Sequence, residues 1–187
     1  MKRVIPCLLY SNGGLYKTTR FKKRKYIGDP INSIKLFSDL EVDELIILDI
    51  DASRENSGPN YSLINDIANE CFMPVCYGGG IKTIDGVSRL LSIGVEKVSI
   101  NSKFIEDKGF ATELANTFGS QSIVCSLDVK TGLFGKKYLY NYLLGKFIKE
   151  DILEYAKSLE SAGVGELFLT SVDHEGTMSG LDLEILD

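Results

Sequence analysis

The chain has 187 residues, a formal net charge of −5, 44% hydrophobic residues and 25% charged residues. This composition is typical of one globular domain with a sizeable core, and it excludes a disordered or fibrous chain. Its acidic balance makes nucleic acid a poor candidate partner. The apolar runs are too short for a membrane span or a signal peptide.

Short apolar runs rich in β-branched residues alternate with segments of helical periodicity, which is the pattern of βα units with buried parallel strands. The predicted strands are Val4 to Leu9, Glu44 to Asp49, Pro74 to Tyr77, Lys97 to Asn101, Ser122 to Asp128 and Glu166 to Thr170. The predicted helices are Ile31 to Leu40, Tyr61 to Glu70, Ile84 to Ile93, Phe110 to Phe118 and Ile152 to Ala162. This alternation predicts an α/β fold.

Internal repetition favours a (β/α)8 barrel of two half-barrels over an open doubly wound sheet. The segments around Leu9 and Asp128 resemble each other, as do those around Glu44 and Glu166, each pair being about 120 residues apart. A complete duplicate would reach roughly residue 240. We therefore expect residues 1–187 to form a single incomplete barrel domain, truncated at the C-terminus to about six βα units, which predicts aggregation or dependence on a partner.

The predicted strands end in polar residues, where a (β/α)8 barrel carries its reactive groups. These residues are Asp49, Asp51, Gly78, Gly79, Gly80, Asn101, Ser102, Asp128, Thr170, Ser171 and Asp173. The three glycines with Asn101 and Ser102 could cradle a phosphate through backbone N–H groups, and the alternative is a tight turn. Asp128 ends an apolar run and is either a general acid/base or a loop-capping residue.

Three further features bear on chemistry. The four cysteines lack CxxC spacing and His174 is the only histidine, so we expect no metal and no cofactor. The cysteines also favour a reducing, cytoplasmic location. His174 itself is expected to be solvated. Arg3, Glu44, Lys97 and Glu166 stand at strand starts, either as a ring of paired charges or as unrelated surface residues. The basic run 20–25 is either a solvated loop or a mobile lid that attracts an anion.

Several strings together resemble the cyclase subunit of imidazole glycerol phosphate synthase. They are VIPCLL, GDPI, DELIILDIDAS, CYGGGI, GVEKVSINS, TFGSQSIV, LDVK and GELFLTSVDHEGTMSG. The resemblance covers the whole chain and implies a (β/α)8 barrel that uses ammonia from a glutaminase partner on a phosphorylated small-molecule substrate.

The resemblance also implies roles for individual residues. One phosphate site would include Gly80, Asn101 and Ser102, and part of a second would include Glu175, where the family usually has Asp, and Gly176. Lys17, Asp49 and Thr170 also stand at family positions, and Ser171 adjoins them. Arg3, Glu44, Lys97 and Glu166 occupy the four positions of the family's ammonia gate. The rest of the second phosphate site would belong to barrel units that follow residue 187.

The family uses two catalytic aspartates, of which Asp128 matches the second, whereas Leu9 stands at the position of the first. This departure resembles a divergent branch associated with amidation of acetamido sugars in surface polysaccharide, where a sugar amidotransferase would be a further partner. Three functions stay open: ammonia delivery in that branch, authentic cyclisation in histidine biosynthesis, and a non-catalytic fragment that binds or activates the glutaminase.

Overall fold

The computed structural model describes residues 3–185 of the chain. Parallel strands alternate with helices, which confirms the predicted α/β class. The chain packs as two compact units, one of residues 3–16 with 26–100 and the other of 17–25 with 101–185. Within the described range, no helix is both long and apolar enough to cross a membrane. The single-domain prediction includes four residues that lie outside this range.

All six predicted strands are present. They are β1 (Cys7–Ser11), β4 (Leu45–Asp49), β5 (Val75–Gly78), β6 (Lys97–Ile100), β7 (Ile123–Thr131) and β10 (Glu166–Ser171). The first begins three residues later than predicted, because Pro6 has no N–H to donate to a neighbouring strand and the Val4 N–H bonds instead to the Asp43 carboxylate at 3.0 Å.

All five predicted helices are present as well, each with bounds within one residue of the prediction at either end. They are α1 (Pro30–Asp39), α3 (Tyr61–Glu70), α4 (Ile84–Ile93), α6 (Gly109–Phe118) and α7 (Ile152–Ser161). Four of them begin at a residue whose side chain accepts a backbone N–H of the first turn, namely Asp29, Asn60, Thr83 and Asp151. Such N-caps fix where each helix starts after the preceding strand.

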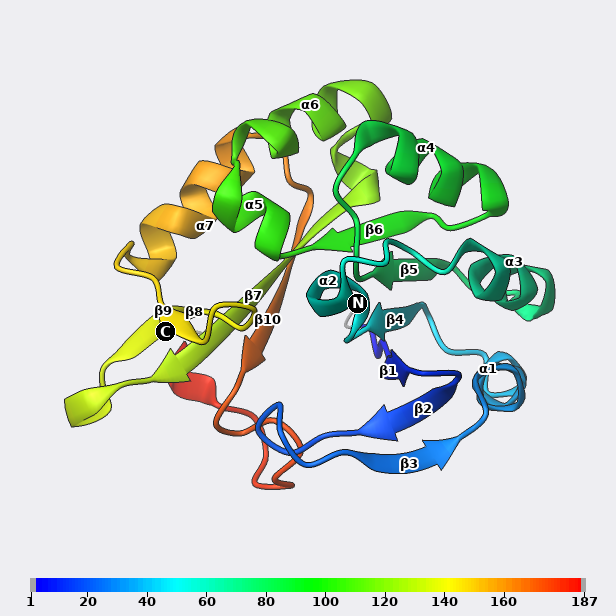
Figure 1. Ribbon diagram of the computed structural model, residues 1–187, viewed down its shortest axis with the longest axis horizontal. Coiled ribbons are helices and arrows are strands. Elements are labelled where there is room, and N and C mark those ends of the chain that lie inside the picture. Colours follow the sequence, from blue (N-terminus) through cyan, green and yellow to red (C-terminus); the bar gives the residue numbers. More distant parts are fainter. Residues whose placement is uncertain (1–2, 186–187) are drawn as a thin grey trace. The chain divides into compact units, whose positions relative to one another are not determined.

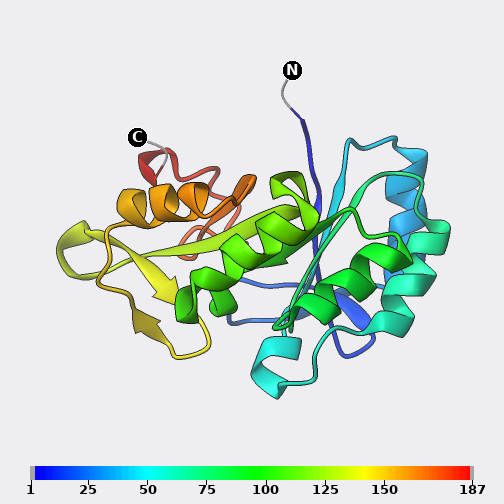
Figure 2. The same cartoon turned by 90° about the horizontal axis from the view of Figure 1, so that it is seen from above.

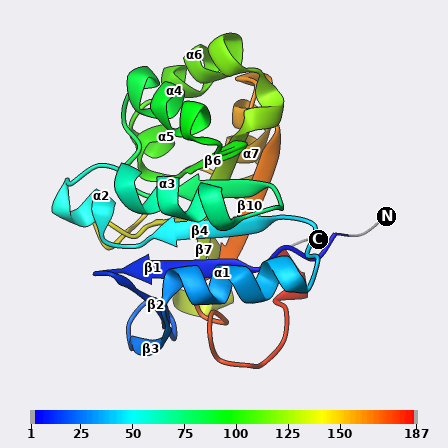
Figure 3. The same ribbon diagram turned by 90° about the vertical axis from the view of Figure 1, so that its right-hand side faces the viewer.

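The first unit is a sheet in the order β3-β2-β1-β4-β5-β6, in which β1, β4, β5 and β6 run parallel. Figure 1 shows α1, α3 and α4 in a row along one side of these strands. Figure 3 shows β1 and β4 side by side and pointing the same way, with α1 along them. Because the parallel strands share one direction, their carboxyl ends lie at one edge of the sheet and their amino ends at the other.

The second unit is built on the long strand β7, which pairs in parallel with β10 and antiparallel with β8 (Lys137–Asn141). Strand β9 (Lys146–Phe147) pairs with β8, and Figure 2 shows the two as a yellow hairpin. The short helix α5 (Ser102–Glu106) precedes α6, and both belong to this unit.

The elements missed from the sequence are mainly antiparallel hairpin strands. Strands β2 (Gly14–Lys17) and β3 (Lys25–Gly28) follow β1, just as β8 and β9 follow β7, and α2 (Ala52–Glu55) and α5 are short helices after β4 and β6. Thus β1 and β7, the two strands related by the sequence repeat, are each followed by a strand that turns back antiparallel.

Candidate functional site

The predicted site residues divide between the two units. The first unit contains Arg3, Glu44, Asp49, Gly80 and Lys97, and the second contains Lys17, Asn101, Ser102, Asp128, Glu166, Thr170, Ser171, Glu175 and Gly176. Each group is described within its own unit.

Asp128 is a buried carboxyl group near the end of β7, with 9% of the residue exposed. The side-chain amide of Asn101 donates to its Oδ2 at 2.8 Å. Burial raises the pKa of Asp128 to about 7, against the opposing effect of the Asn101 hydrogen bond. A carboxyl group with this pKa can both take up and release a proton near neutral pH, which is what general acid/base catalysis requires.

The surroundings of Asp128 explain its desolvation. A narrow crevice beside it has no space for a water-sized molecule; its lining is Asn101, Ile105, Leu127, Asp128, Leu139, Tyr140, Ile148 and Tyr155. On the paired strand β10, Thr170 is the residue directly opposite Asp128. The structure therefore brings three of the predicted site residues, Asp128, Asn101 and Thr170, into one place in the second unit.

Asn101 and Ser102 begin α5, where the phosphate site was predicted. The Asn101 side chain makes no capping bond to this helix, and its amide N–H donates to Asp128. Its hydrogen bond favours the ionised form of that carboxyl group. The phosphate-binding role of Asn101 and Ser102 stays a prediction.

The glycines after β5 are required by close packing in the first unit. Gly79 has φ +115°, and a Cβ there would stand 2.3 Å from the carbonyl oxygen of Asp49. The Gly80 N–H, a predicted phosphate donor, donates to the Ser53 hydroxyl at 3.1 Å. Phosphate binding at Gly80 would have to replace this internal acceptor, and it also stays a prediction.

One carboxylate ends β4 and another follows it, and only the first accepts backbone N–H groups at the start of the next helix. Asp49 accepts the backbone N–H groups of Asp51 and Ala52 at 3.1 and 2.9 Å, and burial raises its pKa despite these bonds. Asp51 is buried and accepts a hydrogen bond from the Ser11 hydroxyl at 2.5 Å. Ser11 lies two residues after Leu9 on β1 and thus on the same strand face. The Ser11–Asp51 pair was not foreseen, since nothing local in either segment signals it.

Three of the four predicted gate residues meet in the first unit. Glu44 is 2% exposed, and its Oε2 lies 2.8 Å from Lys97 Nζ and 3.2 Å from an Arg3 guanidinium nitrogen. Both partners approach the same oxygen atom, Arg3 from the segment before β1 and Lys97 from the start of β6, so one buried carboxylate is paired with two cations. Glu166 begins β10 in the second unit, opposite Val124 of β7.

Glu175 and Gly176, the predicted second phosphate site, follow β10. Both Glu175 carboxylate oxygens accept hydrogen bonds from the 17–25 segment, Oε1 from the Thr18 hydroxyl and Oε2 from the Phe21 N–H. Lys17 Nζ lies 3.5 Å from Met178 Sδ in the same region. Glu175 thus contacts protein groups of its own unit, and its phosphate-binding role stays a prediction.

A cluster missed from the sequence surrounds Asp182. The Ser171 hydroxyl donates to Asp182 Oδ2 at 2.7 Å, and Lys137 Nζ lies 2.5 Å from the same oxygen. These hydrogen bonds lower the pKa of Asp182. Ser171 therefore serves this cluster, which no spacing in the sequence indicates because its members come from three separate segments.

Two expectations concern metals and histidine. No cluster of three or more histidine, cysteine or acidic residues with metal-binding geometry occurs among residues 3–185. His174 was expected to be solvated, but its Nδ1 is buried and has no hydrogen-bond partner. The residue as a whole is of intermediate exposure, so it is neither fully solvated nor buried.

Comparison with known proteins gives one family and several relatives. The family model described as "Histidine biosynthesis protein" matches residues 3–187, in agreement with the predicted (β/α)8 type of α/β fold. A Pseudomonas aeruginosa protein named "Putative imidazole glycerol phosphate synthase subunit hisF2" is 50% identical over 186 residues, which cover 100% of this chain and 74% of the relative.

Two further relatives have similar names. The Vibrio vulnificus protein "Putative imidazole glycerol phosphate synthase subunit hisF3" is 49% identical over 97% of this chain and 70% of its own length. The Leptospira interrogans protein "Putative imidazole glycerol phosphate synthase subunit HisF" is 45% identical over 98% of this chain and 73% of its own length.

Proposed function

Because this chain belongs to the histidine biosynthesis protein family, we propose that it is a cyclase-type subunit that uses ammonia supplied by a glutaminase partner. The relatives named as imidazole glycerol phosphate synthase subunits support this assignment. We place the protein in the cytoplasm, with a phosphorylated small molecule as substrate.

The observation that carries the proposal is the ion cluster around Glu44. Burying a carboxylate costs several kcal/mol unless it is fully paired, and a buried pair is often no more stabilising than apolar residues of the same size. Stability alone therefore gives little reason for Glu44, Lys97 and Arg3 to meet at the amino ends of the strands. A gate that admits neutral ammonia gives a reason, and Glu166 is the proposed fourth member.

The same edge of the first unit carries exposed apolar side chains. Val4, Leu40 and Phe72 lie just before β1, β4 and β5, and Phe72 is 94% exposed. Because the three strands are parallel, these residues and Glu44 lie at one edge of the sheet. We propose that the glutaminase binds at this edge. It would then cover the apolar side chains and release ammonia next to the charged cluster.

The acceptor of the ammonia is inferred from the residue at position 9. A leucine cannot transfer a proton, and removing a positioned acid or base typically costs about 10²- to 10⁴-fold in rate. The Leu9 side of the site thus lacks the carboxylate that imidazole ring formation uses in the family. We propose that the ammonia serves a separate sugar amidotransferase that amidates an acetamido sugar of surface polysaccharide.

Authentic cyclisation for histidine biosynthesis is the second candidate. The specific observation in its favour is Asp128, whose pKa of about 7 suits a working acid/base. A protein that only passes ammonia onward would have little use for such a group.

The proposed channel is tested by Lys97→Glu, which places a second carboxylate beside Glu44. Like charges at this distance repel, so we expect the gate to open or distort. With the glutaminase partner, glutamine hydrolysis should continue while ammonia-dependent product formation falls at least about tenfold. Lys35→Glu on exposed α1 is the charge-matched control. Unchanged coupling in Lys97→Glu would argue against a gate.

The acceptor is tested by offering the protein the histidine-pathway ribulosyl phosphate substrate with ammonium salt, beside a Leu9→Asp variant. If the unaltered protein does not convert this substrate and the Leu9→Asp variant does, the result supports ammonia delivery to another acceptor. Turnover by the unaltered protein would favour the second candidate and would require a proton route that does not involve residue 9.

A further inference from the structure

The 17–25 segment and the loop after β10 are joined by a compact set of hydrogen bonds, all within the second unit. The Glu175 carboxylate accepts from the Thr18 hydroxyl at 2.5 Å and from the Phe21 N–H at 2.9 Å. The Glu175 carbonyl oxygen accepts the Arg20 N–H at 2.9 Å. Glu175 thus accepts hydrogen bonds from three residues of the facing segment, Thr18, Arg20 and Phe21.

The bonded segment contains a turn that is unfavourable by itself. Lys22 N–H donates to the Thr19 carbonyl at 3.1 Å, and the two central residues, Arg20 and Phe21, have φ of +53° and +57°. Turns with two positive φ values normally take Asn or Gly, because a Cβ is strained there. Such strain persists only where the surroundings hold it, and Glu175 receives the N–H groups of both strained residues.

Two more contacts fix the position of this turn. Arg20 Nε donates to the carbonyl oxygen of Asp173 at 3.0 Å, and the Phe21 ring meets Tyr142 edge-on with centroids 5.5 Å apart. A Cβ at Gly176 would come within van der Waals overlap of the Thr18 carbonyl oxygen, at 1.9 Å. Glycine at 176 is therefore needed for the close approach of the two loops.

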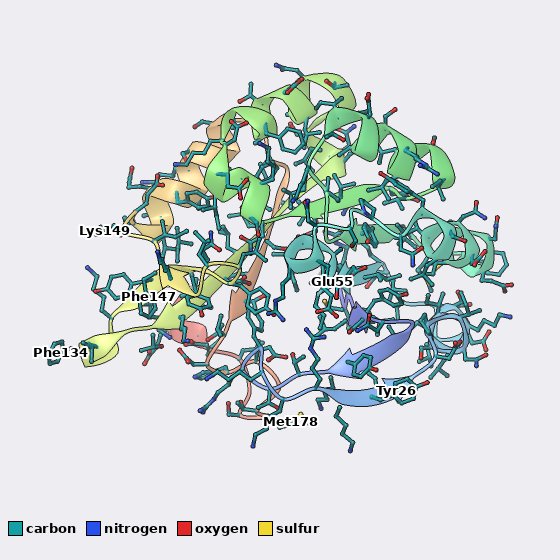
Figure 4. The ribbon with its side chains drawn as sticks, viewed as in Figure 1. Tyr26, Glu55, Phe134, Phe147, Lys149 and Met178 are labelled. Atoms are coloured by element: carbon teal, nitrogen blue, oxygen red, sulfur yellow. The ribbon has the colours of Figure 1, made fainter. Side chains whose placement is uncertain are left out.

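We propose that Glu175 is a positioning residue, whose carboxylate and carbonyl hold the Thr19–Lys22 turn in place and thereby fix a cationic arm that recruits anions. The arm is Lys22, which closes the turn, and the three residues after it, Lys23, Arg24 and Lys25; all four are exposed. The loop after β10, which contains Glu175, can be found in Figure 4 by the labelled side chain of Met178. The sequence suggested either a solvated loop or a mobile lid for the basic run. Neither interpretation includes the attachment of this segment to Glu175.

The inference changes the expected role of Glu175. Both carboxylate oxygens are engaged by donors of the 17–25 segment, and a negative group directly beside a bound phosphate would repel it. Glu175 then acts on an anion only indirectly, through the position of the four cations. The inference rests on the proposed function only in taking a phosphorylated substrate as the natural anion.

Trypsin gives a direct test, since it cleaves after every cation of the arm and after Arg20. We expect Glu175→Ala to be cleaved in this segment at least about tenfold faster than the unaltered protein, because two hydrogen bonds to a carboxylate no longer oppose opening of the turn. Thr18→Val, which removes one of these bonds, should give a smaller acceleration. Glu113→Ala on the exposed face of α6 is the matched control. Cleavage of Glu175→Ala at the unaltered rate would overturn the proposal.

Protection of the arm by inorganic phosphate tests whether the arm recruits anions or whether Glu175 only holds two loops together. At constant ionic strength set with chloride, phosphate should slow cleavage of the unaltered arm, and Glu175→Ala should need at least about fivefold more phosphate for the same protection. Equal protection of both proteins, or none in either, would refute the anion-recruiting part. Neither assay involves ammonia or a glutaminase, so failure of the proposed function would leave both results interpretable.

Discussion

Replacing Asp128 with Asn should stabilise the protein at alkaline pH and, where the protein itself catalyses cyclisation, abolish ammonia-dependent synthesis. Burial raises the pKa of Asp128 from the usual 3.8 to about 7, which corresponds to roughly 4 kcal/mol of unfavourable free energy for the ionised form in the folded protein. The asparagine amide has nearly the same shape, carries no charge, and keeps a carbonyl oxygen that can accept the Asn101 amide.

The pH dependence of this effect has a definite sign. Between about pH 4 and pH 7 the folded protein holds a proton on Asp128 that the unfolded chain releases, so the contribution of Asp128 to the free energy of unfolding falls as pH rises. The stability advantage of Asp128→Asn should therefore be small near pH 4, grow up to about pH 7 and stay constant above it.

Urea unfolding of both proteins from pH 5 to pH 8.5, followed by circular dichroism, measures the advantage. Asp66→Asn on the exposed side of α3 removes the same charge from the surface and controls for net charge. A stability difference that does not change with pH would refute the assignment of a raised pKa. Unchanged ammonia-dependent turnover would remove Asp128 from the mechanism.

Two other substitutions test the site. Asn101→Ala removes a hydrogen bond that favours ionised Asp128, and such a bond to a charged acceptor is worth ~1.5–3 kcal/mol. The pH profiles of stability and of the ammonia-dependent rate should therefore both move to higher pH. Profiles that do not move would contradict the contact. Gly79→Ala adds a Cβ 2.3 Å from the Asp49 carbonyl oxygen at φ +115°, so thermal unfolding should show a loss of at least ~3 kcal/mol, or about 6–12 °C. Gly13→Ala, at φ +83° with open space around it, separates the cost of φ from the steric clash, and equal losses would refute the steric part.

The parallel strands and their helices were predictable because each is bounded by a clear local signal. Strand β7 is mostly apolar up to Asp128, with Ser126 as the one polar residue, and it is buried on both faces there. Helix α4 lies between a Thr83 cap and Gly94 at positive φ, which are ordinary start and stop signals.

The hairpin strands were not predictable from hydrophobic runs. Strand β3 is largely exposed along its length, and β9 is exposed at both residues. Such strands bury little apolar surface, so their sequences show no strong pattern, and they form because a neighbouring strand supplies hydrogen bonds. Exposed aromatic residues, such as Phe147 packed against Tyr138 and Tyr140, were the one available hint.

The site was predictable only as far as strand ends reveal it. The position of Asp128 at the end of an apolar run pointed to a desolvated carboxyl group. Its contact with Asn101 was not foreseeable, because the two residues come from different strand ends and meet only through the packing of the second unit. The contacts of Glu175 depend likewise on a segment about 150 residues earlier in the chain, which no local pattern can reveal.

The repeated hairpins have a consequence for the history of the protein. A strand followed by an antiparallel partner occurs at β1 with β2 and again at β7 with β8, as a duplicated and fused gene segment would leave it. Copies joined in one chain accumulate substitutions independently. The sequence repeat places Leu9 and Asp128 at related positions, where one half has an apolar side chain and the other an ionisable group. On this interpretation the two halves offer different chemistry at the related position, because only the side chain in the second half can exchange a proton there.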